Sequence, residues 1–257
     1  MKIAVCVKQI PDPATPYALD PESHWVIRPE EQILDDTDRY GVEVGLQVAE
    51  ANEGTVTLYS MSPAGSLQGI RQALSMGADK AIIVDDDTLR GSDALGTARV
   101  LAAAIERDGF DVVIAGTEST DGYSGVVPQM MAELLDVPAL SFARKVEVSA
   151  EGARIERQTA VGYDVVESDL PVLMTVTSGV VEPRYPTFKG IMNAKKKTIE
   201  QITAADLGLA DQVAPSASGQ AIVDVSPIAA RSGGEIIEDE GEAHLRVIAL
   251  LEQAKVV

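Results

Sequence analysis

The amino-acid sequence predicts an α/β protein with a mostly parallel sheet and flanking helices. Over the first 145 residues, short apolar runs alternate four times with amphipathic stretches of helical length, which is the pattern of βα units. The apolar runs are continuous, as is typical of parallel strands buried on both faces. The predicted strand–helix pairs are 3–7 with 39–52, 55–60 with 66–76, 80–85 with 92–108, and 111–116 with 125–135.

Two residues are expected to mark helix ends in this region. Ser92 precedes the third predicted helix and has a side chain suited to an N-cap. Gly77 follows the second predicted helix, where a residue in the left-handed conformation commonly ends a helix.

The character of the chain changes after residue 145. Short strands that would form a small β-rich extension are expected at 146–149, 154–159 and 163–167, and an apolar strand at 173–177. From residue 204 onward the chain is small and polar, which predicts an extended arm ending in a helix at 243–254. Because such an arm cannot build its own core, we expect a main domain at 1–203 and an arm at 204–257 that packs on that domain or on a partner.

Composition excludes several classes of function. The chain has 257 residues, with 21 Lys and Arg against 40 Asp and Glu, and its net charge of −19 argues against binding to nucleic acid or to anionic membranes. A single cysteine and two histidines leave no disulfide framework and disfavour a multi-histidine metal centre. No apolar run reaches the roughly 18 residues of a transmembrane helix, and the N-terminal run is too short for a signal peptide, so we expect a cytoplasmic protein without membrane insertion.

The most informative loop for chemistry is GTESTDGYSGVVP at 116–128, which follows a predicted strand and precedes a helix. Ligands of parallel sheets bind beyond the carboxyl ends of the strands, and a Gly-rich loop at a helix N-terminus offers backbone N–H groups to phosphate oxygens. Gly116, Gly122 and Gly125 leave room for close approach. The spacing matches neither a GxGxxG fingerprint nor a P-loop. The alternative is a long turn whose polar residues only cap the helix.

Other candidate groups favour structural roles. Cys6 lies inside an apolar strand and is expected to be an inert thiol, and His24 is expected at the surface. Asp35, Asp36 and Asp38 could resemble a metal cluster but are explained more simply as acids of a first helical turn. The cations at 195–197 are either solvated or steer an acidic partner. Because no catalytic triad, paired carboxylates or metal-ligand spacing emerges, a binding or carrier role is favoured over catalysis.

Four stretches carry a resemblance to one family: VKQIPD at 7–12, ALSMGADKA at 73–81, GTESTDG at 116–122 and EPRYPTFKGIMNAKKK at 182–197. Along nearly all of its length, the chain resembles the β subunit of electron transfer flavoprotein. The resemblance implies a nucleotide-binding-like fold and a heterodimer with an α subunit that holds the redox-active FAD. It also implies electron transfer from flavin-dependent dehydrogenases, acyl-CoA dehydrogenases of fatty acid β-oxidation among them, to a quinone reductase or another acceptor.

In the common class of this family, the resemblance implies one AMP bound structurally in the β subunit. In the electron-bifurcating class, the same site holds a second FAD and NADH is oxidised there, which is the main alternative. A stand-alone adenine-nucleotide sensor is a further alternative that the long C-terminal arm disfavours. We therefore expect a non-catalytic carrier subunit whose arm packs on the α subunit.

Carried over by matching position, the nucleotide site would comprise Cys6, Asp35, Asp36, Thr37, Asp38, Met61, Gly116, Thr117, Glu118, Ser119, Thr120, Asp121, Gly122, Tyr123, Ser124, Gly125, Val126 and Val127. The phosphate is expected near Ser124 to Val127. AMP-binding members carry an Asn-Gln-Thr-Gly run where this chain has Gly125, Val126, Val127 and Pro128, so backbone N–H groups must do more here or the ligand differs.

The segment 186–197 resembles the family's recognition loop, which docks on the dehydrogenase through one apolar anchor. The expected contact residues are Pro186, Thr187, Phe188, Lys189, Gly190, Ile191, Met192, Lys195, Lys196 and Lys197. Phe188 takes the anchor position, usually Leu, and the alternative is that its ring packs on its own domain. Gln158 stands where the family often has a Glu that contacts the mobile flavin domain.

Overall fold

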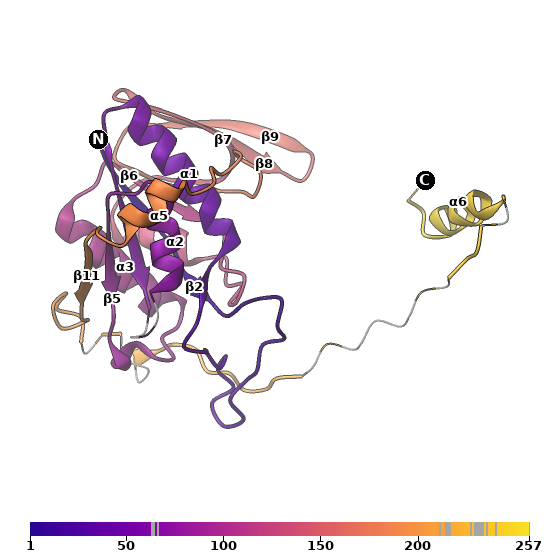
Figure 1. The fold of residues 1–257 in the computed structure, drawn as a ribbon, viewed down its shortest axis with the longest axis horizontal. Helices are drawn as coiled ribbons and strands as arrows, with labels where there is room; N and C mark the ends of the chain where they lie inside the picture. The colour runs from indigo at the N-terminus through magenta and orange to yellow at the C-terminus, as the bar shows by residue number, and fades with distance from the viewer. Residues whose placement is uncertain are drawn as a thin grey trace. The chain divides into compact units, whose positions relative to one another are not determined.

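The computed structural model describes residues 1–62, 65, 67–210, 212–213, 217–226, 228, 234, 236–239 and 241–256. The chain divides into two compact units, Met1–Ile222 and Val223–Val257. The first unit contains the sheet and the five helices α1 to α5, and the second contains α6 (Figure 1).

Nine of the described strands form one sheet in the order β11-β5-β4-β1-β6-β10-β7-β8-β9. The seven strands from β11 to β7 are parallel, and β8 and β9 extend the sheet in antiparallel pairing. A separate antiparallel pair joins β2 to β3. This topology confirms the predicted fold class. The strands are β1 Lys2–Cys6, β2 Gln9–Ile10, β3 Ile33–Leu34, β4 Thr55–Met61, β5 Lys80–Val84, β6 Val112–Gly116, β7 Ala139–Ser149, β8 Gly152–Thr159, β9 Gly162–Ser168, β10 Val172–Val176 and β11 Ile199–Ile202.

Helices cover both faces of the parallel part of the sheet, which explains why strands such as β5, β6 and β10 are continuously apolar. One core cluster joins the sheet to α1 (Asp36–Ala51), α2 (Gln68–Met76) and α5 (Phe188–Ala194). These three helices lie together in front of the sheet in Figure 1. The other cluster joins the opposite face to α3 (Ala94–Asp108) and α4 (Val127–Leu134), and the short 3-10 helix η1 (Asp87–Leu89) precedes α3.

The structure corrects the prediction at several points. Asp93, not Ser92, caps α3, because its carboxylate accepts a hydrogen bond from the Gly96 N–H at 2.8 Å. The hydroxyl of Ser92 instead donates to the carbonyls of Leu89 and Val213. Strand β7 begins before the change at residue 145, because its first residues pair with β10 in the parallel sheet. The expected start of the second helix at Ser66 lies outside the described residues, and α2 ends at Met76 with Gly77 at φ 149° as expected.

Several elements of the first unit were not predicted: the pair β2 and β3, the 3-10 helix η1, helix α5 and strand β11. The segment 186–197, expected as a recognition loop, contains α5, which starts because the Thr187 hydroxyl accepts a hydrogen bond from the Gly190 N–H at 3.0 Å. Strand β11 adds four residues to the edge of β5. Beyond β11, Ala204 and Val213 are buried against the core, so the first unit extends past the boundary expected at 203/204.

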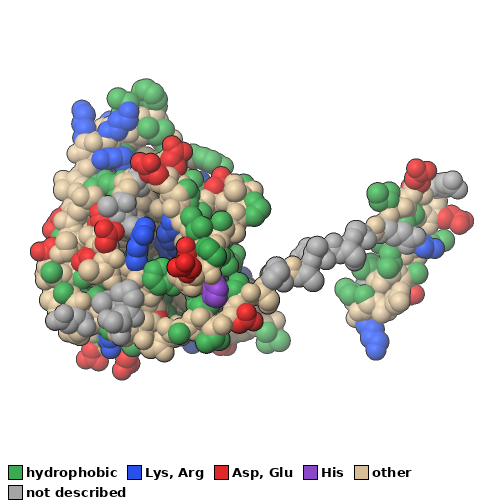
Figure 2. Space-filling view, turned by 90° about the horizontal axis from the view of Figure 1, so that it is seen from below, with side chains coloured by type: hydrophobic (Ala, Val, Ile, Leu, Met, Phe, Trp, Pro, Cys, Tyr) green, Lys and Arg blue, Asp and Glu red, His purple; other side chains and the backbone are tan. Residues whose placement is uncertain are grey.

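The second unit contains the predicted C-terminal helix, α6 (Ala243–Gln253), which has no buried residue. Its large apolar side chains are exposed, and Figure 2 shows hydrophobic side chains on the surface of this unit. They include Leu245, Val247, Ile248 and Leu250.

Helix α5 is held against α2 by hydrogen bonds from side chains to backbone carbonyls, as well as by close packing. The Arg71 guanidinium donates to the Ala194 carbonyl at 2.9 Å. The Lys197 ammonium donates to the carbonyls of Leu74, Gly77 and Ala78, where α2 ends. Gly190 lies so close to α2 that a Cβ atom at this position would be 2.5 Å from the Ser75 carbonyl oxygen.

We expect Gly190→Ala to destabilise the protein by about 1–3 kcal/mol, because the added methyl group must push α5 away from α2. Thermal unfolding of the purified protein should show a lower midpoint, by about 2–10 °C for a chain of this size. Gly234→Ala is the matched control, since no described residue lies within 4 Å of a Cβ at that position. Equal midpoints for the Gly190→Ala variant and the wild type would contradict the close contact.

Candidate functional site

The candidate site lies where strands β1 and β6 end. Strand β1 pairs with β4 on one side and β6 on the other, and the chain leaves β1 and β6 toward helices on opposite faces of the sheet. Ligands of open parallel sheets bind at such a switch point. Three segments meet there: the residues after β1, the start of α1, and the loop 117–126 between β6 and α4.

Asp35 connects the start of α1 to the loop. Its side chain is fully buried and caps the helix, because Oδ1 accepts hydrogen bonds from the N–H and the hydroxyl of Thr37 at 3.0 and 2.8 Å. Oδ2 accepts from the N–H and the hydroxyl of Thr120 at 2.7 and 3.0 Å. Both oxygens are therefore occupied by the protein itself. A buried carboxylate is stable only when paired or hydrogen-bonded in this way.

Asp38 occupies the narrow space between β1 and β6. Its Oδ2 accepts the N–H of Lys8 at 2.6 Å, and a Cβ on Gly116 would lie 3.1 Å from Oδ1. Burial, together with the nearby charge of Asp35, raises the pKa of Asp38 well above its ordinary value. Gly116 is thus required for close packing. The first-turn interpretation of Asp35, Asp36 and Asp38 agrees with the structure, in which Asp35 is the N-cap and the others follow it.

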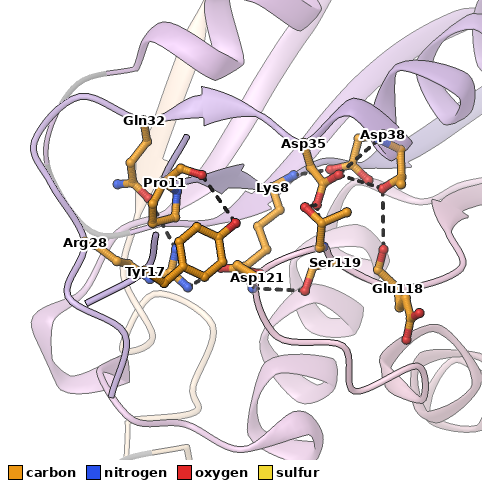
Figure 3. Close-up of polar contacts among 12 residues, drawn as sticks. Lys8, Pro11, Tyr17, Arg28, Gln32, Asp35, Asp38, Glu118, Ser119 and Asp121 are labelled. Atoms are coloured by element: carbon orange, nitrogen blue, oxygen red, sulfur yellow. Dashed lines mark hydrogen bonds and ion pairs between the residues drawn. The ribbon is translucent and has the colours of Figure 1, made fainter. Parts of the chain in front are cut away.

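Asp121 joins the loop to two cations (Figure 3). Its side chain is fully buried and forms ion pairs with the Lys8 ammonium, at 2.7 Å, and with the Arg28 guanidinium. The Lys8 ammonium also donates to the Ser119 hydroxyl at 3.3 Å. Burial by itself would raise the pKa of Asp121, but the charges of Lys8 and Arg28 outweigh it and hold the pKa below its ordinary value.

Lys8 and Arg28 are site residues that the sequence did not reveal. Lys8 directly follows the first apolar run, within the VKQIPD motif, so its position after a strand was an available signal. Arg28 lies in a long polar segment with no local pattern, and only the tertiary fold brings it to Asp121, 93 residues away.

Cys6 and Met61 lie at the ends of adjacent strands, β1 and β4, and both are partly exposed. The enclosed position of the Cys6 thiol, together with the charge of Asp38, raises its pKa to about 12. The thiol therefore stays protonated at neutral pH and is unsuited to nucleophilic chemistry. Both side chains remain available as apolar contacts at this edge of the sheet.

The last part of the loop leads into α4 without a side-chain cap. Gly125 has φ 64°, a conformation that favours glycine, and Tyr123 has φ 47° and an exposed ring. Val126 precedes the first turn of the helix, and Pro128 lies within that turn, where a missing N–H costs little. The start of α4 thus presents backbone N–H groups next to a glycine, an arrangement that can accept an anion.

The second predicted surface, at 186–197, is mostly α5. The Phe188 side chain is 82% exposed, so its ring does not pack on its own unit, and Ile191 and Met192 are exposed beside it. Lys195 and Lys196 are exposed after the helix. Lys197 differs, because its ammonium donates to three carbonyls and burial lowers its pKa. This geometry gives Lys197 a structural role in holding α5.

No group of three or more His, Cys, Asp or Glu side chains in the described part of the chain is placed to hold a metal ion. None of the helices in the same residues combines the length and apolar character that crossing a bilayer requires.

Fold and site together define a parallel α/β protein whose polar loops gather at the switch point of the sheet. Residues 24–207 match the family described as electron transfer flavoprotein domain. Proteins named electron transfer flavoprotein subunit beta are 38% identical in Mycobacterium tuberculosis, over 99% of each chain, and 34% identical in Megasphaera elsdenii, over 94% of each. One from Bacillus subtilis is 33% identical over 75% of this chain and 73% of its own. The chain belongs to the electron transfer flavoprotein family, among its β subunits.

We expect Asp121→Asn to destabilise the protein by about 2 kcal/mol at pH 7, because Lys8 and Arg28 lose their shared buried counter-charge. The pKa of Asp121 is lower in the folded protein than its ordinary value of 3.8, so its stabilising effect is complete above that value. The effect is lost as the pH falls below 3.8 through the folded-state pKa. Denaturant unfolding of wild type and variant from pH 7 to pH 3 measures this stabilising effect. The difference in unfolding free energy between the two proteins should narrow toward pH 3.

The matched control is Asp36→Asn, which removes the same charge from a side chain that is 79% exposed and, among the described residues, forms an ion pair with Arg39 alone, at 3.5 Å. This variant should stay within about 0.5 kcal/mol of the wild type. A difference between Asp121→Asn and wild type that is independent of pH would contradict the ionised state of Asp121.

Proposed function

We propose that this chain is the β subunit of a heterodimeric electron carrier, which accepts electrons from flavin-dependent dehydrogenases and passes them to a quinone reductase or another acceptor. The observation that carries the proposal is the match to β subunits over 99% of the chain. An electron carrier needs docking surfaces and a fixed cofactor, but no acid, base or nucleophile from this chain. The protonated thiol of Cys6 and the internally bonded carboxylates of Asp35 and Asp121 agree with that role.

The proposal includes one AMP at the switch point, with a structural role. The uncapped start of α4 beside Gly125 fits a phosphate, which the backbone N–H groups of Ser124 to Val127 would hold. Cys6 and Met61, at the ends of β1 and β4, would supply apolar contacts. A bound nucleotide would stabilise the folded protein by mass action, because it binds the folded state and not the unfolded one.

Two exposed surfaces support docking to other proteins. Phe188 projects from α5, and α5 is fastened to α2 through the Gly190 contact and the ammonium of Lys197. An exposed aromatic ring on a firmly held helix suits an anchor for the dehydrogenase. The apolar side chains of α6, none of which is buried, support the second unit as a contact with the α subunit that holds FAD.

A second candidate function is electron bifurcation, in which the β-subunit site holds a second FAD and NADH is oxidised there. One observation favours it. AMP-binding members of the family carry an Asn-Gln-Thr-Gly run, and this chain has Gly125, Val126, Val127 and Pro128 at those positions. Without those side-chain donors, the phosphate of AMP would depend on the backbone alone.

Nucleotide content separates the two candidates. We expect the chain, co-expressed and purified with its α subunit, to release one FAD and one AMP per heterodimer on denaturation, as measured by chromatography against standards. Release of two FAD and no AMP would overturn the AMP assignment in favour of bifurcation, with NADH oxidation as the next assay. Failure to purify a complex containing both chains would count against the carrier function itself.

We expect Phe188→Ala to slow reduction of the heterodimer by its dehydrogenase at least about tenfold, since loss of an anchor costs 2 kcal/mol or more. Heterodimer formation should be unchanged, because the ring is 82% exposed and its loss disturbs little of its own unit. Stopped-flow reduction of the bound flavin and size-exclusion chromatography measure the two effects.

Val161→Ala is the control for that experiment, because Val161 is also fully exposed but lies in the β8–β9 turn. Its reduction rate should equal that of the wild type. If Phe188→Ala also leaves the rate unchanged, Phe188 is not the anchor.

A further inference from the structure

We propose that the switch-point site selects nucleotides by their phosphate charge, and that Glu118 is the residue responsible. The site would favour an adenine nucleotide with a single phosphate and disfavour the diphosphate and triphosphate. This inference rests on the nucleotide site proposed above and adds to it a specificity-determining residue.

The first observation is the position of Glu118. Its carbonyl oxygen accepts a hydrogen bond from the Thr37 hydroxyl at 3.4 Å, which holds the backbone of the loop. Its side chain is exposed and directed away from Lys8 and Asp121 (Figure 3). A Cβ on Gly125 would lie 3.2 Å from Glu118 Oε2, so this carboxylate lies beside the start of α4. The Glu118 carboxylate makes no ion pair or hydrogen bond with the described residues.

The second observation concerns the cations near the loop. Among the described residues, only Lys8 and Arg28 form ion pairs with loop 117–126, and both pair with the fully buried carboxylate of Asp121. Lys8 is held further by the Ser119 hydroxyl. Their charge is thus partly neutralised by the protein itself. In a P-loop, by contrast, a lysine reaches the terminal phosphates of the ligand.

These observations set the charge balance at the helix start. Backbone N–H groups and the helix dipole there can hold one phosphate. Each additional phosphate adds negative charge near the Glu118 carboxylate without adding a cation to meet it. Like charges within several ångströms of each other in a partly solvated site repel each other. We expect this repulsion to weaken binding by about three- to tenfold per added phosphate. The net charge of −19 acts in the same direction from farther away, and salt screens it.

The test uses the heterodimer freed of bound adenine nucleotide, titrated calorimetrically with AMP, ADP and ATP in EDTA. The wild type should bind AMP most tightly and ATP most weakly. Glu118→Gln should lower the ratio of AMP affinity to ATP affinity by about 10- to 100-fold, because the charge that repels each of the two extra phosphates is gone. Glu151→Gln is the matched control, because Glu151 is exposed in the β7–β8 turn and its loss changes net charge equally; its ratio should equal that of the wild type.

A second measurement needs no variant. Raising the salt concentration should bring the affinities of the wild type for AMP and ATP closer together, because screening weakens repulsion. A ratio that is unchanged by Glu118→Gln, or changed equally by Glu151→Gln, would overturn the role of Glu118 while leaving the AMP site standing. If AMP, ADP and ATP all fail to bind the wild type, the proposed AMP site falls and this inference falls with it.

Discussion

The buried carboxylate of Asp35 is the interaction on which the switch point depends. Four hydrogen bonds converge on its two oxygens, two from Thr37 in the first turn of α1 and two from Thr120 in the loop after β6. One side chain thereby caps a helix on one face of the sheet and fixes a loop that leads to a helix on the other face. Because a buried charge without such partners is very costly, the loop and the helix start are constrained to meet.

Charge neutralisation at Asp121 shapes the chemistry of the same region. In a chain of net charge −19, a site for an anionic ligand needs either free cations or backbone donors. Lys8 and Arg28 are both paired with Asp121, so backbone donors at the start of α4 would be the main attraction for the phosphate proposed there. The same contacts connect the segment after β1, the polar segment around Arg28 and the loop 117–126 into one structure. The rigidity of this region and the proposed ligand preference thus have a common origin.

The proposed docking surface on α5 and the switch point share a structural support. Gln9, one residue after Lys8, accepts hydrogen bonds from the N–H groups of Gly69 and Ile70 at the start of α2. Helix α2 in turn holds α5 through Arg71 and the carbonyls at its C-terminus, which bind Lys197. Phe188 is therefore presented by a helix whose position is set from the core of the first unit. A surface built on packed helices suits repeated docking better than a loose loop.

The sequence by itself determined the fold class, the four βα units and the position of the loop at 116–127 between a strand and a helix. These follow from local signals, because apolar runs of strand length and Gly-rich strand-to-helix turns depend on neighbouring residues. The tertiary structure alone decided that Arg28 reaches Asp121, that Lys197 caps α2 rather than facing solvent, and that Glu118 lies beside Gly125. Each of these pairs residues far apart along the chain or depends on how a side chain points. Long-range charge pairing leaves no periodic trace in a sequence, so only the folded chain could show it.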